Sequence, residues 1–200
     1  MPNLNRERGE VAMVMGACLW TPKILWEELG GFPEWFGSIG EDLYLCCRAR
    51  LAGYPVRALG GSGFRHQVGR SFGGGKVAAG RLATTYRRRA LSERNKTFVM
   101  IVCQPALLLA VLLPLHLFLI HLEGLLVAVM KRDCVLWREI YAPLLPRLWI
   151  ERGRLRAERS TIQATRTIAL VDWLGPFRWL PWKLRMLFRH GLPEVKDRSS

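Results

Sequence analysis

Two adjacent carboxylates, Glu41 and Asp42, have the residue types and the position best suited to chemistry in this 200-residue chain. They follow Gly40 and precede a segment with helical spacing of apolar residues, so we expect them at a loop-to-helix junction. A carboxylate held there can face a pocket and accept a proton from a hydroxyl group, as a general base does. Acidic residues at a helix start also stabilise the helix dipole, and on the local pattern alone that structural interpretation is the commoner one.

The elements that must position this pair are expected to alternate between strands and helices. Thr21 and Pro22 are typical of a helix start, and Gly30 is suited to a left-handed helix end. Apolar spacing, turn residues and β-branched residues predict the remaining elements. In chain order we expect a buried strand at 11–20, a helix at 21–30, an aromatic loop at 32–39, a helix at 41–53, a strand at 54–59, a glycine-rich stretch at 60–75 and a basic helix at 77–96.

Charge and aromatic content restrict the class of partner. Lys and Arg number 30 against 16 Asp and Glu, which indicates an anionic partner. The chain also has 8 Trp, most of them near an apolar run or the C-terminus, and indole rings beside basic side chains favour a membrane interface over nucleic acid. The five Cys have no zinc spacing, so we expect reduced thiols on the cytosolic side.

Residues 98–130 form an apolar segment in which Glu123 is the one charged residue. As a single helix its 33 residues would reach roughly 50 Å, against a hydrocarbon core of about 30 Å. Pro105 and Pro114 interrupt the run, and both flanks are basic. A re-entrant or in-plane helical hairpin satisfies both length and charge, and one tilted crossing at 98–122 is the alternative.

Three further features near this segment have two interpretations each. His116, His121 and Glu123 are either an intramembrane polar site or side chains with ordinary partners. Residues 173–188, in which Trp, Leu and Phe alternate with Arg and Lys, predict an interfacial amphipathic helix, with a packing helix as the alternative. Consecutive cations at Arg87, Arg88 and Arg89 are expected to contact lipid headgroups or the phosphates of a donor.

Several short motifs recur here in one order and near one spacing, and together they resemble a known family. They are Gly16-Ala17 with Leu19, Gly30-Gly31-Phe32, Gly40-Glu41-Asp42, Arg48, Ala52-Gly53-Tyr54, His66 and Glu93-Arg94-Asn95. This order resembles the C-terminal half of the catalytic domain of bacterial family 2 inverting glycosyltransferases, in the rhamnosyltransferase-like branch.

The resemblance implies an α/β fold: the C-terminal portion of a GT-A nucleotide-diphospho-sugar transferase domain, followed by membrane-associated helices. Three segments are expected: an acceptor-side half at 1–96, a hydrophobic membrane segment at 97–130 and a basic amphipathic helical tail at 131–200. The implied activity is transfer of a sugar from a nucleotide-sugar to a lipid-linked or cell-envelope glycan, with inversion. The expected location is the cytoplasmic face of the inner membrane.

The resemblance also implies roles for individual residues. Asp42 would deprotonate the acceptor hydroxyl, and Glu41 would position the acceptor or the base. His66 would ligate Mg²⁺ or Mn²⁺ in a metal-dependent enzyme, whereas a lone His is otherwise a surface residue. The turn bordering the acceptor pocket would be Gly30, Gly31 and Phe32, with a helix cap plus a core aromatic as the structural alternative.

The chain departs from the family pattern in two ways. Pro33 stands where the family usually has Asp, and Tyr44 stands where it commonly has an acidic residue. Both departures bear on which class of acceptor the protein uses. No Asp precedes Asp42, and the metal-binding DxD motif of the donor half is missing. We therefore expect a truncated or split transferase that works with a separate N-terminal donor-binding half; the alternative is an inactive membrane-anchored remnant or partner subunit.

Overall fold

Helices dominate the computed structural model, which is 68% helical. The structure describes residues 2–4, 9–61, 63–65, 76–78, 81–177, 182–191 and 194–196. The longer helices are α1 (Lys23–Glu28), α2 (Glu41–Leu51), α3 (Tyr86–Cys103), α4 (Ala106–Lys131), α6 (Leu144–Ile150), α7 (Arg152–Ala164), α8 (Leu170–Leu174) and α9 (Trp182–His190). Short turns of helix are η1 (Gly16–Cys18), η2 (Glu34–Phe36), α5 (Cys134–Leu136) and η3 (Trp137–Tyr141).

The strands are short and lie in three small sheets. They are β1 (Pro2–Leu4), β2 (Gly9–Glu10), β3 (Arg57–Ala58), β4 (Gly63–Arg65), β5 (Lys76–Ala78), β6 (Arg81–Thr85) and β7 (Glu194–Lys196). β1 pairs with β4, β2 with β3 and β5 with β6, all antiparallel, while β7 is parallel to β6. The α/β prediction therefore holds in part: both kinds of element occur, but helices prevail, and a GT-A sheet stays a prediction.

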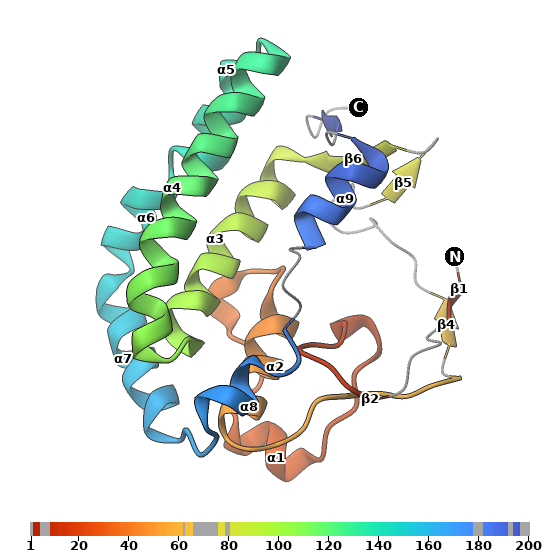
Figure 1. Cartoon of the computed structure of the whole chain (residues 1–200), viewed down its shortest axis with the longest axis vertical. Coiled ribbons are helices and arrows are strands. Elements are labelled where there is room, and N and C mark those ends of the chain that lie inside the picture. Colours follow the sequence, from red (N-terminus) through yellow and green to blue (C-terminus); the bar gives the residue numbers. More distant parts are fainter. Residues whose placement is uncertain are drawn as a thin grey trace.

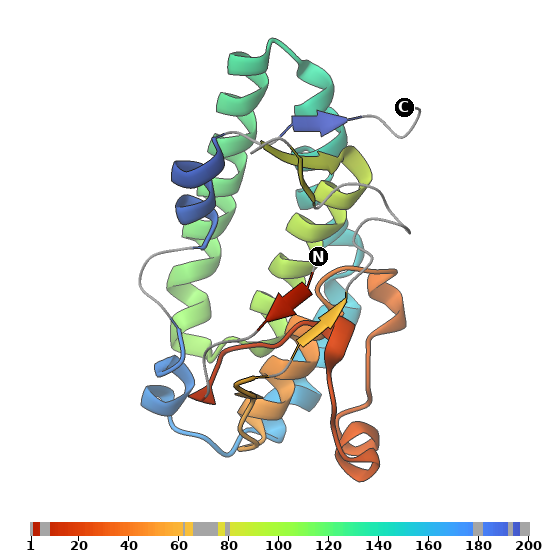
Figure 2. The ribbon, with the colours of Figure 1, turned by 90° about the vertical axis from the view of Figure 1, so that its right-hand side faces the viewer.

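A pair of helices, α3 and α4, forms the centre of the molecule. They lie side by side and run in opposite directions, with α6 and α7 on one side and α2 crossing near the C-terminal end of α3 (Figure 1). The view turned by 90° shows the same antiparallel pair (Figure 2). Pro105 lacks an N–H and cannot continue α3, so the helix ends at Cys103, the chain reverses at Gln104 and Pro105, and α4 begins at Ala106.

One core joins residues that are far apart in the sequence. Its buried members come from α2, α3, α7 and α8: Tyr44, Cys47, Leu51, Phe98, Val99, Val102, Cys103, Leu155, Ile162 and Trp173, together with Phe36. The predicted segments 1–96, 97–130 and 131–200 thus pack on one another, and their assignment as functional units stays a prediction.

Local sequence signals identified α1 and α2 correctly. Gly30 has φ +70°, as expected for a left-handed helix end, and α2 begins at Glu41. The strand predicted at 54–59 is present but limited to β3. The buried strand predicted at 11–20 is wrong, because η1 interrupts the run and most of its side chains are partly or fully exposed.

The helix predicted at 77–96 begins nine residues later than expected. Residues 81–85 form β6 instead, since β6 pairs with both β5 and the distant β7. The helix α3 then starts at Tyr86, with the Thr85 hydroxyl accepting a hydrogen bond from the Arg88 N–H at 3.2 Å. It continues to Cys103, so residues 98–103 of the apolar segment end α3 and the rest of that segment from Ala106 lies in α4. A membrane hairpin or a single crossing stays a prediction.

Two predictions about the apolar segment and the tail need correction. Pro114 does not interrupt α4 but lies inside it, with an exposed ring. In the tail, Trp173 belongs to α8 and is fully buried in the core, so the packing alternative is correct for that residue. The interfacial prediction then concerns α9 alone, where Leu187 and Phe188 are exposed.

Candidate active site

Asp42 is the second residue of α2, and its carboxylate is held by two backbone N–H groups. Gly16 donates to Oδ2 at 3.2 Å, and Leu43 donates to Oδ1 at 2.8 Å. The first bond spans 26 residues and ties the segment before α1 to the start of α2. Each carboxylate oxygen has further lone pairs, so Asp42 can also accept a proton from a hydroxyl group. The structure therefore orients the predicted base and leaves lone pairs of its carboxylate available to accept a proton.

Gly16 brings Asp42 and Phe32 together. A methyl group added at Gly16 would lie 3.4 Å from the Cβ of Asp42 and 3.6 Å from the Cζ of Phe32. The backbone of η1 thus contacts the predicted base, and a side chain at Gly16 would also contact the ring of Phe32. The residue types of the Gly16-Ala17 motif gave no indication of this contact, which depends on how the loops fold back.

The two glycines before Phe32 shape the turn that positions its ring. Gly31 has φ +61°, and a Cβ there would lie 2.8 Å from the ring of Trp26. Trp26 in turn meets Phe32 edge-on, with ring centroids 4.9 Å apart. Gly30 and Gly31 therefore end α1 and orient Phe32, which keeps 36% of its surface exposed and is not a core aromatic. Direct contact of these residues with an acceptor stays a prediction.

Glu41 has a carboxylate oxygen that the protein does not satisfy. Its Oε2 atom is buried and has no hydrogen-bond partner among the described residues. Burying an unpartnered carboxylate oxygen is unfavourable, so such atoms in native structures usually have a reason. A role of Glu41 in positioning the acceptor or the base stays a prediction.

The loop before Gly40 is fastened to α3 by Asn95, a residue that the sequence analysis did not assign to the site. Asn95 is fully buried, and its Nδ2 donates to the carbonyl oxygens of Phe36, Ser38 and Ile39 at 3.2, 2.8 and 2.7 Å. Arg94 donates from Nε to the Asn95 Oδ1 at 2.9 Å, which fixes the orientation of the amide.

The same loop contains a strained residue. Ile39 has φ +68°, an unfavourable conformation for a β-branched side chain, and Gly40 follows with φ +92°. A Cβ at Gly40 would lie 3.3 Å from the Cβ of Asn95. Because Asn95 holds this conformation from one side, it determines where Glu41 and Asp42 begin α2.

Tyr44, at the position where the family commonly has an acidic residue, points away from Asp42. Its side chain is buried in the core, and its hydroxyl donates to Glu158 of α7. Burial, together with that hydrogen bond, raises the pKa of Tyr44 well above its usual value. The departure at this position thus contributes to packing between α2 and α7.

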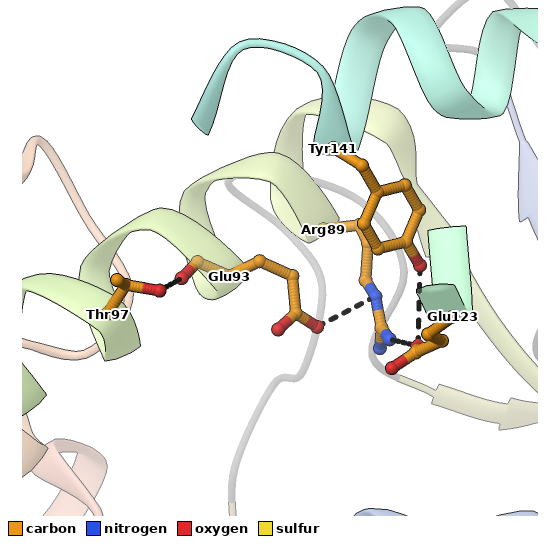
Figure 3. A network of polar contacts seen from close by, with 5 residues as sticks. All are labelled: Arg89, Glu93, Thr97, Glu123 and Tyr141. Atoms are coloured by element: carbon orange, nitrogen blue, oxygen red, sulfur yellow. Dashed lines mark hydrogen bonds and ion pairs between the residues drawn. The ribbon is translucent and has the colours of Figure 1, made fainter. Parts of the chain in front are cut away.

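The three consecutive arginines have different surroundings. Arg87 is exposed and Arg88 partly buried. Arg89 forms ion pairs with Glu93 at 3.0 Å and with Glu123 of α4 at 2.7 Å (Figure 3). Burial opposes the charge of Arg89, but the two carboxylates prevail and keep its pKa above the usual value. A lipid or donor-phosphate contact of Arg87, Arg88 and Arg89 stays a prediction.

The polar residues of α4 have ordinary partners, as one of the two interpretations stated. His116 Nε2 lies 2.8 Å from the Thr97 hydroxyl, and His121 Nδ1 lies 2.7 Å from the Leu117 carbonyl oxygen. Glu123 accepts from Arg89 and, at 3.4 Å, from the Tyr141 hydroxyl (Figure 3). The contacts of His116 and Glu123 attach α4 to α3 and to η3, while that of His121 lies within α4.

The structure gives no independent support for a metal ion. His66 lies outside the described residues, and within the described part of the chain no three His, Cys, Asp or Glu side chains gather as a metal site would require. Mg²⁺ or Mn²⁺ stays a prediction, and no chemical step is assigned to it.

A cavity of about 690 Å³ lies elsewhere, between α7 and the first residue of α4. Its lining consists of Ala106, Arg156, Arg159, Ser160, Gln163, Arg166 and Ile168. None of the predicted site residues borders it, so it is separate from Asp42.

Comparison with known proteins bears on the site. The family model described as Glycosyl transferase family group 2 matches residues 3–150. This range includes Gly16, Phe32, Asp42 and Asn95. Neither the curated proteins nor the solved structures gave a match.

Proposed function

Because the chain belongs to glycosyl transferase family group 2, we propose that it transfers a sugar from a nucleotide-sugar to a lipid-linked or cell-envelope glycan acceptor, with inversion at the anomeric carbon. The observation that carries this proposal is the carboxylate of Asp42, oriented by two backbone N–H groups beside Phe32. The proposed location is the cytoplasmic face of the cell membrane, the side on which nucleotide-sugars are made.

Inverting transfer is a single displacement, and one carboxylate on the acceptor side is sufficient for it. The acceptor oxygen attacks the anomeric carbon from the face opposite the diphosphate, while its proton passes to a carboxylate oxygen of Asp42. The bond between the anomeric carbon and the diphosphate oxygen breaks, and the nucleoside diphosphate leaves with the electron pair. Its negative charge needs cationic stabilisation, which we expect from the donor-binding half.

Glu41 and Phe32 have complementary roles in this proposal. Glu41, next to Asp42 at the start of α2, positions the acceptor or the base. The partly exposed ring of Phe32 offers an apolar surface on which a sugar face can lie. Together they hold the attacking hydroxyl near Asp42, and such positioning contributes much of the rate in group transfer.

The test is the variant Asp42→Asn, assayed for transfer from a panel of nucleotide-sugars in two membrane preparations, one with the chain alone and one with a separate donor-binding half added. We expect the rate to fall about 10²- to 10⁴-fold, the usual contribution of a general base. Asp172→Asn, an exposed carboxylate in α8, is the matched control and should keep full activity. Unchanged turnover in Asp42→Asn would disprove the base assignment.

The same assay addresses the alternative of an inactive remnant or partner subunit. Transfer that appears only when the separate donor-binding half is present supports a split enzyme. If no donor is turned over in either preparation while a glycan still binds, the chain is a binding subunit and not a catalyst.

A further inference from the structure

The helix α4 has one long apolar face that no part of the described structure covers. Among the described residues it is the one helix long and apolar enough to cross a membrane. Its exposed apolar side chains recur every three or four residues and form what we call the outer face: Leu107, Val111, Leu115, Phe118, Leu119, Leu122, Leu125, Leu126, Val129 and Met130. The opposite, inner face contains buried Ile120, Gly124 and Ala128.

We propose that α4 lies in the plane of a single lipid leaflet, with its outer face in the acyl layer and its inner face on α3, and that it does not cross the membrane. The occupant of the outer face is thus an anionic phospholipid surface. This inference concerns attachment only, so it stands or falls independently of sugar transfer.

The inner face is attached too firmly to swing away from the protein. A Cβ at Gly124 would lie 2.4 Å from the ring of Tyr141, so the backbone of α4 is in direct contact with η3. The Arg89–Glu123 ion pair and the Thr97–His116 contact add two polar attachments to α3. Wherever α4 lies, the neighbouring half of α3 must lie beside it.

Helix length shows what a crossing would require. The 26 residues of α4 span about 39 Å, and a hydrocarbon core of about 30 Å takes up about 20 of them. A window of about 20 residues inside 106–131 always includes residues 112–125, and therefore both His116 and Glu123. Their partners on α3 are Thr97 and Arg89, so a crossing would bring residues 89–97 into the hydrocarbon core as well.

That stretch of α3 is unsuited to lipid. It holds Arg89, Glu93, Arg94, Asn95 and Lys96 within nine residues, and charged side chains at the centre of a bilayer are strongly unfavourable. Arg94 and Asn95 also hold the loop before Gly40, so the site itself would be drawn into the membrane. An in-plane helix avoids this, because amphipathic helices bury only about 5–10 Å of one side.

Cations at both ends of α4 favour the same orientation. At the C-terminal end Lys131 and Arg132 are exposed. At the N-terminal end Ala106 borders the cavity that Arg156 and Arg166 line. A crossing would place these two groups on opposite sides of the membrane, whereas an in-plane helix places both at the level of one anionic headgroup layer.

Two native cysteines test the topology without any substitution. Cys18 precedes α4, Cys134 follows it, and both are exposed, while the other three cysteines are buried. The full chain is treated with a membrane-impermeant maleimide in sealed right-side-out and inside-out vesicles of the expressing cell. We expect Cys18 and Cys134 to react from the same, cytoplasmic side. Reaction from opposite sides would overturn the proposal in favour of a crossing.

A binding experiment tests the occupant. The purified chain is sedimented with vesicles of phosphatidylcholine and phosphatidylglycerol, and Phe118→Glu combined with Leu126→Glu should weaken binding at least about 100-fold. The matched control, Trp20→Glu with Ile24→Glu, alters two exposed apolar side chains outside α4 and should bind as the unmodified chain does. Circular dichroism and thermal unfolding confirm that both variants are folded.

Two results of the binding experiment would overturn the proposal. Equal loss in the control variant would show that the outer face of α4 has no special role. In the second result, the chain does not bind vesicles and light scattering shows a dimer, which becomes a monomer in the Phe118→Glu/Leu126→Glu variant. That result would show that a second copy covers this face.

Discussion

The side-chain amide of Asn95 donates a 2.7 Å hydrogen bond to the carbonyl oxygen of Ile39, two residues before Glu41. This bond joins the middle of α3 to the loop that leads into the start of α2. Because the loop includes the strained Ile39, the amide and its neighbour Arg94 stabilise a conformation that the loop alone would not adopt. The position of the predicted base therefore depends on a residue 53 positions later in the chain.

Replacing Asn95 by Ala should impair both stability and transfer. The carbonyl oxygens of Ser38 and Ile39 would lose the donor that Asn95 supplies, while that of Phe36 keeps its hydrogen bond from Arg94. Unsatisfied buried acceptors cost about 1–3 kcal/mol each, so we expect a loss of at least about 2 kcal/mol in the free energy of unfolding. The measurement is urea unfolding, combined with transfer assays below the unfolding range. If folded Asn95→Ala retains the full rate, Asn95 does not position Asp42.

Replacing Gly16 by Ala should reduce transfer with little effect on folding. The added methyl would make ordinary van der Waals contacts of 3.4 and 3.6 Å with Asp42 and Phe32, in the space where an acceptor hydroxyl would approach. We expect the free energy of unfolding to change by no more than about 0.5 kcal/mol and the acceptor KM to rise. An unaltered KM would indicate that the acceptor does not approach between these residues.

Replacing Gly31 by Ala should be strongly destabilising. Its φ of +61° disfavours any Cβ, and the methyl would lie 2.8 Å from the ring of Trp26. Gly37→Ala is the matched control, because Gly37 has φ +71° but nothing within 4 Å. In the control, the backbone conformation alone should lower the free energy of unfolding by about 1–2 kcal/mol. In Gly31→Ala, the clash with Trp26 should lower it by about 1–3 kcal/mol more. Equal melting temperatures would show that Trp26 can move aside.

The parts of the structure that could be predicted from sequence are those that local signals determine. Pro22 precedes the first residue of α1, so this helix begins one position later than the Thr21–Pro22 pattern predicts. Gly30 follows the end of α1 and Glu41 starts α2, because turn residues act within a few positions. The motif order also indicated the family correctly. Asp42 and Phe32 were named as site residues, and the structure places both close to Gly16.

The remaining features depend on contacts between distant residues, which local patterns do not encode. β6 pairs with the preceding strand β5 and also with β7, which lies more than 100 residues away, although the sequence of β6 also suited a helix. Trp173 appeared suited to a membrane interface, but its ring lies in the core and its Nε1 donates to Gln104 at 2.9 Å. The attachment of the Ile39 loop to Asn95 likewise arises only when α3 packs against it.

Alkaline pH should destabilise the protein through Tyr141. Burial, assisted by the carboxylate of Glu123 and opposed by Arg89, raises the pKa of Tyr141 from about 10 to about 12. The folded state therefore favours the neutral phenol, and this contribution is complete below pH 10 and is lost as the pH rises from 10 to 12. The melting temperature of Tyr141→Phe should fall less than that of the unmodified chain between pH 10 and pH 12. Identical pH profiles would show that the pKa of Tyr141 is the same in the folded and unfolded states.

Arg89 should be the residue on which the attachment of α4 to α3 depends most. Its guanidinium is paired with Glu93, whose side chain is 4% exposed, and with Glu123, whose side chain is 31% exposed (Figure 3). Arg89→Met would leave the Glu93 charge buried without its partner, and losing one member of a buried pair costs about 3–5 kcal/mol. Glu123→Gln should cost only about 1 kcal/mol, because Arg89 and Glu93 remain paired and the amide oxygen still accepts a hydrogen bond. Urea unfolding of the two variants, with Arg138→Met as an exposed control, measures this difference. The contrary outcome is that Arg89→Met proves no less stable than Glu123→Gln. In that case the buried carboxylate of Glu93 does not depend on Arg89. The attachment of α4 then relies on the contact between Gly124 and Tyr141.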